Sequence, residues 1–69
     1  MNVVLNGAVR ELADGITTIS DLLATLDVPP EGRGVAVAID AEVVPRGAWA
    51  ATVLEDGARV EVVHAVQGG

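Results

Sequence analysis

Only one stretch of this chain repeats its apolar residues with the period of an α-helix. Four apolar residues stand at i, i+3, i+4 and i+7, the spacing of one side of a helix. They are Ile19, Leu22, Leu23 and Leu26. We therefore predict a helix over residues 18–26, and Thr18 and Asp21 fit a capping box at its start, with Asp in place of the usual Glu. A chain with a single amphipathic helix must bury the apolar side of that helix against strands.

The remaining apolar residues fall into short runs with the composition of β-strands, separated by turn residues. Residues 1–13 are predicted as a β-hairpin, because Asn6-Gly7 tolerates a positive φ at both positions of a two-residue turn. Further strands are predicted at residues 35–39, 42–44 and 59–66. One or two helical turns are expected within residues 46–54, with Trp49 in or near the core. This order predicts an α+β fold of the β-grasp type, with one main helix packed on a mixed sheet of four to five strands.

The composition is that of a small globular domain without covalent reinforcement. Of the 69 residues, 51% are hydrophobic, which excludes a typical disordered chain. There is one Trp, no Tyr and no Phe, so the core must consist mainly of Val, Leu, Ile and Ala. There is also no Cys, which excludes a disulfide, a thiolate nucleophile and a cysteine metal site. We expect one domain over residues 1–66 and a flexible tail at residues 67–69.

The charge of the chain is strongly acidic. Ten Asp and Glu residues stand against four Arg residues, for a net charge of −6. Phosphate backbones would repel such a chain, so we expect no nucleic acid as a partner, and a basic protein surface is the more natural one. No run approaches the ~20 apolar residues of a membrane span, and the start lacks a signal-peptide pattern. We therefore expect a cytoplasmic protein without a membrane partner, and a monomer when free.

Most of the side chains used in catalysis are missing or isolated. His64 is the only His and lies on a predicted strand, while Ser20 lies within the predicted helix, so a Ser-His-Asp site is not expected. One His among scattered carboxylates is a poor metal set, and Gly32-Arg33-Gly34 lacks the context of a phosphate-binding loop. Arg46 is expected to pair with a nearby acid, or alternatively to contact a partner. We therefore expect neither a metal nor a cofactor site.

The sequence ends on Gln67, Gly68 and Gly69, directly after a strong strand. Such an end can simply be frayed. Two observations favour a function instead: the change from strand to Gly-Gly is abrupt, and two glycines form a thin rod without side chains. The carboxylate of Gly69 is ionised at pH 7 and can attack a phosphorus atom. From Ala65 to Gly69 an extended chain reaches roughly 17 Å, enough to enter a partner's active site.

The pleat of the predicted sheet separates a helix-facing set of residues from an outward set. The helix-facing set is Val3, Leu5, Val35, Val37, Ile39, Val60 and Val62. The outward set is Val4, Ala36, Ala38, Val63 and Ala65. Since Ala has a low strand propensity, two Ala residues on an exposed face indicate a flat apolar patch beside the tail that docks partners. Alternatively, another element of the chain covers this face.

The whole chain resembles the family of sulfur carrier proteins of thiamine biosynthesis (ThiS), which are ubiquitin-like β-grasp proteins. The resemblance rests on residues 1–7 (MNVVLNG), residues 35–42 (VAVAIDAE), Val44-Pro45-Arg46 with Trp49, Asp56-Gly57, Val60-Glu61-Val62 and the closing Ala65-Val66-Gln67-Gly68-Gly69. Two positions depart from the family pattern, and neither lies in the tail. Asp40-Ala41 stands where Asn-Gly is expected, and His64 stands where Thr or a similar residue is expected.

The resemblance implies a carrier protein and not an enzyme. A ThiF-type adenylyltransferase would bind ATP and activate the Gly69 carboxylate as an acyl-adenylate. Sulfur from a cysteine desulfurase route would convert that adenylate to a thiocarboxylate, and thiazole synthase would take the sulfur for the thiazole ring. ATP would belong to the partner, so this chain would bind no cofactor. With neither Cys nor Lys, the chain has no side-chain thiol to carry sulfur and no lysine amine for its activated end to acylate.

Two alternatives stay open. The small subunit of molybdopterin synthase shares the fold and the tail but gives its sulfur to a pterin. The segment from Pro45-Arg46 to Trp49 and the short length favour the thiamine branch. A β-grasp interaction module or a protein-modifying tag is the more distant alternative. Intact mass separates these classes, because a carrier exchanges one oxygen for sulfur whereas a tag forms an amide with a Lys.

Overall fold

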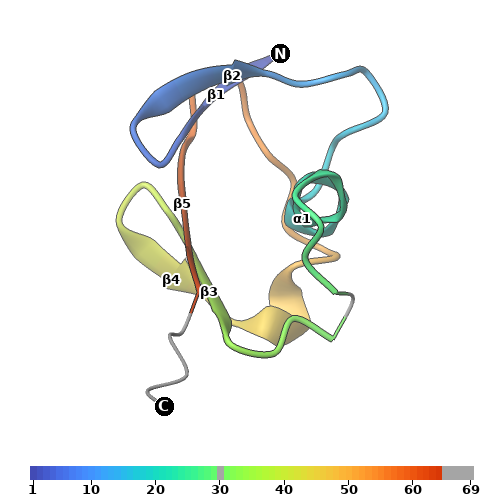
Figure 1. Ribbon diagram of the computed structural model, residues 1–69. Coiled ribbons are helices and arrows are strands. Elements are labelled where there is room, and N and C mark those ends of the chain that lie inside the picture. The colour runs from blue at the N-terminus through green and yellow to red at the C-terminus, as the bar shows by residue number, and fades with distance from the viewer. Residues whose placement is uncertain (30, 65–69) are drawn as a thin grey trace.

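The computed structural model describes residues 1–29 and 31–64, which form one sheet with a single α-helix on one of its faces (Figure 1). The strands are β1 (Asn2–Leu5), β2 (Ala8–Glu11), β3 (Val35–Ile39), β4 (Glu42–Val44) and β5 (Arg59–His64). Their order in the sheet is β2-β1-β5-β3-β4. The central pair β1 and β5 is parallel, and every other neighbouring pair is antiparallel. The predicted β-grasp fold is confirmed.

Both hairpins of the sheet close through two residues with positive φ. Asn6 and Gly7 have φ values of 48° and 84°, and Asp40 and Ala41 have values of 49° and 71°. Two positive φ angles in a row define the turn whose twist matches that of the flanking strands. The turn at residues 6–7 thus forms as predicted, and the turn at residues 40–41 adopts the same geometry without a glycine.

Helix α1 (Ile19–Thr25) begins at the predicted capping box. The Thr18 hydroxyl accepts a hydrogen bond from the Asp21 backbone amide at 3.2 Å, and the Asp21 carboxylate accepts one from the Thr18 amide at 3.1 Å. Leu26 closes the helix as its C-cap. The predicted range of residues 18–26 therefore comprises the helix together with its two caps.

The core lies between α1 and the facing side of the sheet. Its largest fully buried side chains come from both layers: Val3, Ile19, Leu22, Val37 and Val60. Trp49 is also buried, and its indole Nε1 donates to the Val44 carbonyl oxygen at 2.9 Å. Trp49 follows a short 3₁₀ helix, η1 (Arg46–Ala48), which is the helical turn expected in this region. The single aromatic residue thus joins the end of β4 to the core, as the composition requires.

The two faces of the sheet differ as the pleat predicts. The helix-facing residues Val3, Leu5, Val37, Val60 and Val62 are buried, and Val35 and Ile39 pack against the core while partly exposed. On the other face, Ala36 and Val63 are exposed, and Val4 and Ala38 are partly buried. The described part of the last strand ends at His64. The predicted continuation to residue 66, Ala65 and the tail Gln67, Gly68 and Gly69 lie outside the described residues.

Within the described part of the chain, no helix has the length and apolar character needed to cross a membrane.

Candidate docking face and tail root

An apolar surface covers the side of the sheet away from α1. Strand pairing brings its members together in three pairs, namely Val4 with Val9, Ala36 with Val63 and Ala38 with Val43. We call these six residues the outward face. Val9, Val43 and Val63 have exposed fractions of 74%, 71% and 59%. Valines exposed to this extent on one side of a small domain mark a surface suited to bind another protein.

Two members of the outward face, Val9 and Val43, were not predicted from the sequence. Both lie on edge strands, β2 and β4, directly opposite the predicted members Val4 and Ala38. A two-residue turn fixes the register of its hairpin, so the turn at Asn6-Gly7 already implies that Val4 and Val9 pair. The signal was therefore present in the turn, and the patch is wider than the sequence analysis proposed.

Two charged residues of β5 lie between the apolar residues of the outward face and divide its area. Arg59 pairs with Val4, and Glu61 pairs with Ala38. Both charged residues are exposed. A partner that covers this face must therefore offer polar groups to two fixed points among apolar contacts, which gives the interface a defined orientation.

Strand β5, from which the tail continues, pairs with β1 at its first two residues and with β3 from Val60 to His64, and both hairpin turns also hold it. It pairs with β1 and β3, and His64, its last residue, lies opposite Val35. The Asn6 side chain accepts from the Val62 amide at 2.8 Å and donates to the Val62 carbonyl at 3.2 Å. The Asp40 carboxylate accepts from the Arg59 amide at 3.0 Å. The tail therefore starts from a firmly held strand.

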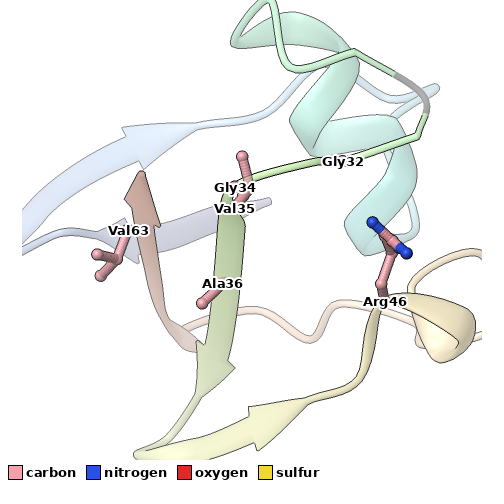
Figure 2. A pocket seen from close by; sticks show the side chains of 6 residues that line it. All are labelled: Gly32, Gly34, Val35, Ala36, Arg46 and Val63. Atoms are coloured by element: carbon pink, nitrogen blue, oxygen red, sulfur yellow. The ribbon is translucent and has the colours of Figure 1, made fainter. Parts of the chain in front are cut away.

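A hollow adjoins the outward face at the end of β5. It is lined by Gly32, Gly34, Val35, Ala36, Arg46 and Val63, and we call it the tail-root hollow. Figure 2 shows Ala36 and Val63 on one side of it and the Arg46 guanidinium on the other, across β3. The hollow thus combines an apolar wall with one cation, directly beside the root of the tail.

The other residues considered for chemistry do not form a site. Ser20 is partly buried on α1, whereas His64 is exposed at the end of β5, and no hydrogen bond joins them in the described structure. No three metal-ligating side chains cluster among residues 1–29 and 31–64. Arg46 takes part in none of the side-chain hydrogen bonds of the described residues, so no hydrogen-bonded pair of Arg46 with an acid forms among them.

The sequence matches the model of the ThiS family over residues 3–69. This match includes the outward face, the tail-root hollow and both closing glycines. The chain belongs to the ThiS family. It is 32% identical to the sulfur carrier protein ThiS of Escherichia coli, over the full length of both chains.

Solved structures of ThiS proteins agree with this assignment. The crystal structure of the thiamine biosynthesis protein ThiS from Geobacter metallireducens superposes with a TM-score of 0.81 at 31% identity, covering all of both chains. A solution structure of a thiamine biosynthesis protein from the same organism gives a TM-score of 0.80 at 32% identity, covering 100% of this chain and 88% of that one. This chain therefore agrees with the ThiS family in fold as well as in sequence.

Two further relatives are longer proteins of another name. The thiazole synthase of Magnetococcus marinus is 41% identical and that of Paramagnetospirillum magneticum 35% identical, each over all 69 residues of this chain. This chain spans only 20% of the length of each thiazole synthase. In these two proteins a ThiS-like segment is thus part of a thiazole synthase chain.

Proposed function

We propose that this protein carries sulfur on the carboxyl group of Gly69 and gives it up for thiazole formation in thiamine biosynthesis. One observation carries the proposal: a firmly held strand, β5, leads from an exposed apolar face into the family's closing Gly-Gly. The outward face supplies the binding surface, and the tail supplies the reacting group. The protein acts as a co-substrate of enzymes and not as an enzyme, and it requires no cofactor or metal of its own.

The proposed chemistry has two steps at Gly69. In the first, a carboxylate oxygen attacks the α-phosphorus of ATP in the active site of a ThiF-type adenylyltransferase, and pyrophosphate leaves. In the second, a sulfur nucleophile attacks the activated carbonyl carbon and AMP leaves, so that the product is a thiocarboxylate. With hydrosulfide (HS⁻) as the nucleophile, the products are the thiocarboxylate anion, the AMP dianion and one released proton. In the cell, a cysteine desulfurase route supplies the sulfur.

The second proposed partner is thiazole synthase, which receives the sulfur. The ThiS-like segments within two thiazole synthase chains support this pairing. Joining two modules in one chain raises their effective concentration, which is useful where the modules must meet. We propose that this protein binds thiazole synthase through the outward face. We also propose that it does so in the cytoplasm and that it is a monomer when free.

The proposal is tested by the intact mass of the protein after incubation with ATP, sulfide and the cognate adenylyltransferase. We expect the mass to change by the replacement of one oxygen with one sulfur, and to stay constant when ATP is omitted. A stable conjugate to a lysine would instead identify a protein-modifying tag. An unchanged mass in the complete reaction would refute the carrier function.

The acceptor of the sulfur is tested next, with the thiocarboxylated protein as donor. We expect thiazole synthase to consume the thiocarboxylate, and the large subunit of molybdopterin synthase to leave it intact. The reverse result would assign the protein to the molybdopterin branch.

A further inference from the structure

Among the described residues that line the tail-root hollow, Arg46 is the one with a charge. It is exposed, it lines the tail-root hollow, and it stands two residues after Val44, which pairs with Val37 of β3. On the other side of β3 the tail root, His64, pairs with Val35. The guanidinium of Arg46 and the start of the tail thus flank the same end of β3 (Figure 2).

The stem of Arg46 rests on a surface built for close packing. Gly32 is buried with a φ of 62°, and a Cβ added there would lie 2.8 Å from the Trp49 ring atom Cη2 and 3.1 Å from Arg46 Cδ. The Trp49 ring is itself fixed by its hydrogen bond to the Val44 carbonyl. Arg46 follows Pro45, whose ring restricts the backbone, and begins η1. The aliphatic stem of Arg46 therefore lies close to Gly32, and its exposed side chain lines the tail-root hollow.

We propose that Arg46 is the anchor by which this protein docks on the adenylyltransferase, through a bidentate pair with an Asp or Glu at the mouth of the channel that admits the tail. This inference rests on the proposed function. Ala36 and Val63 form the apolar wall of the same hollow, so the contact combines a charged pair with apolar burial. Arginine suits this role because its planar fork matches the two oxygens of a carboxylate.

Arg46 belongs to the folded domain and not to the tail, which favours a protein carboxylate over the nucleotide as its partner. Residues 65–69 reach at most roughly 17 Å beyond β5 when extended. When Gly69 reaches the phosphorus of ATP, Arg46 stays behind with the folded domain, beside the tail root. Its guanidinium therefore faces the protein surface around the channel mouth. A positioned cation on a chain of net charge −6 also gives the two proteins a single favoured orientation.

The test compares charge reversal at two arginines in ATP–pyrophosphate exchange by the cognate adenylyltransferase. Arg46→Glu is the test variant. Arg10→Glu makes the same change of net charge on the edge strand β2, where Arg10 is exposed and does not line the hollow. We expect Arg46→Glu to raise the KM for the carrier about tenfold or more with kcat unchanged, and Arg10→Glu to change KM by less than about twofold. Arg46→Lys keeps the positive charge but loses the planar guanidinium, and we expect its KM for the carrier to rise about threefold.

Two further measurements make every outcome decisive. Urea unfolding shows whether each variant is folded. If Arg46→Glu does not fold, the test is made with Arg46→Lys instead. A KM for folded Arg46→Lys equal to that of the wild type would then overturn the proposal. In the adenylyltransferase, reversing one Asp or Glu at the channel mouth to Arg should restore binding of Arg46→Glu and weaken that of the wild type. Equal KM values for the two Glu variants would overturn the anchor while leaving the carrier function intact. Absence of exchange with the wild-type protein would remove the proposed function itself.

Discussion

At the scale of single residues, the first position of each hairpin turn has two tasks. Asn6 and Asp40 both adopt a positive φ, and both also hydrogen-bond to the backbone of β5 through their side chains. Only the first task can be predicted from the sequence, because tolerance of positive φ is a local property. The second requires the turn to lie beside a strand more than 15 residues away, which depends on the tertiary fold. The clamping of β5 was therefore not predicted.

Ala41 adopts a φ of 71°, which is costly for a residue with a Cβ. The Asp40 amide donates to the Arg59 carbonyl at 2.8 Å, and the Asp40 carboxylate accepts from the Arg59 amide. Together these two hydrogen bonds hold the turn in place despite the strain at Ala41. We predict that Ala41→Gly raises the free energy of unfolding by about 0.5–1 kcal/mol. Glycine relieves backbone strain of about 1–2 kcal/mol in the folded state, which exceeds the cost of about 0.4–1 kcal/mol from the added entropy of the unfolded chain.

Urea unfolding measures this change. Ala50→Gly is the matched control, since Ala50 is exposed in a turn and does not have a positive φ. It gains no relief of strain, so its free energy of unfolding should fall. Equal losses in both variants would show that Ala41 is not strained.

At the scale of elements, the start of α1 makes stability depend on pH. The Asp21 carboxylate accepts from the Thr17 amide at 3.0 Å, from the Thr18 amide at 3.1 Å and from the Thr17 hydroxyl at 3.1 Å. These hydrogen bonds favour the charged form and lower the pKa of Asp21 below its ordinary value of 3.8. The bond from the Thr17 amide has the largest effect. The stabilisation is therefore complete above that ordinary value and is lost as pH falls through the lower pKa of the folded state.

We predict that Asp21→Asn makes the protein less stable than the wild type at pH 6, and that the difference shrinks as the pH is lowered below about 4. The aspartate loses its charge in that range, whereas the asparagine has no charge to lose. Free energies of unfolding measured in urea from pH 6 to pH 2.5 provide the comparison. A difference that stays constant across this range would show that the capping carboxylate does not titrate as the hydrogen bonds require.

The elements themselves were largely predictable, and the reason is that each has a local signal. The capping residues, the turn at Asn6-Gly7 and the alternation of Val and Ala in β3 each identify one element without reference to the others. Other features depend on the assembly of elements. The contribution of Val43 requires the register of β3 with β4, and the placement of Arg46 requires the contact of Gly32 with Trp49.

At the scale of the whole molecule, two of the most exposed valines differ in where they lie. Val63 is 59% exposed on the outward face, whereas Val53 is 65% exposed in the segment before β5, where it bridges to Thr18. We predict that Val63→Asp weakens binding to the adenylyltransferase about tenfold to a hundredfold, because a charge would lose its water without gaining a partner. Val53→Asp makes the same chemical change away from the outward face and should leave binding within about twofold of the wild type.

Binding is measured by titration calorimetry, and folding of both variants by circular dichroism. We expect both to fold, since both positions are exposed. Loss of folding in Val63→Asp alone would mean that Val63 supports the core, and equal binding by the two variants would mean that the partner docks elsewhere.

If the outward face binds the partner and the tail only supplies the reacting group, removal of the last residue should separate binding from reaction. Removing Gly69 should leave the free energy of unfolding and the affinity for the adenylyltransferase unchanged, because the outward face and Arg46 are intact. It should nevertheless reduce ATP–pyrophosphate exchange more than about a hundredfold, because the carboxylate would then lie about 3.5 Å short of the phosphorus, and an error of about 1 Å can already cost that much. Gly69→Ala keeps the reach and adds one methyl group, so it separates steric exclusion from lost length.

The truncated protein should also compete with the full-length protein as a docked, unreactive inhibitor. Exchange at the full rate with the truncated protein would show that Gly69 is not the reacting residue, and failure of that protein to compete would show that docking depends on the tail and not on the outward face.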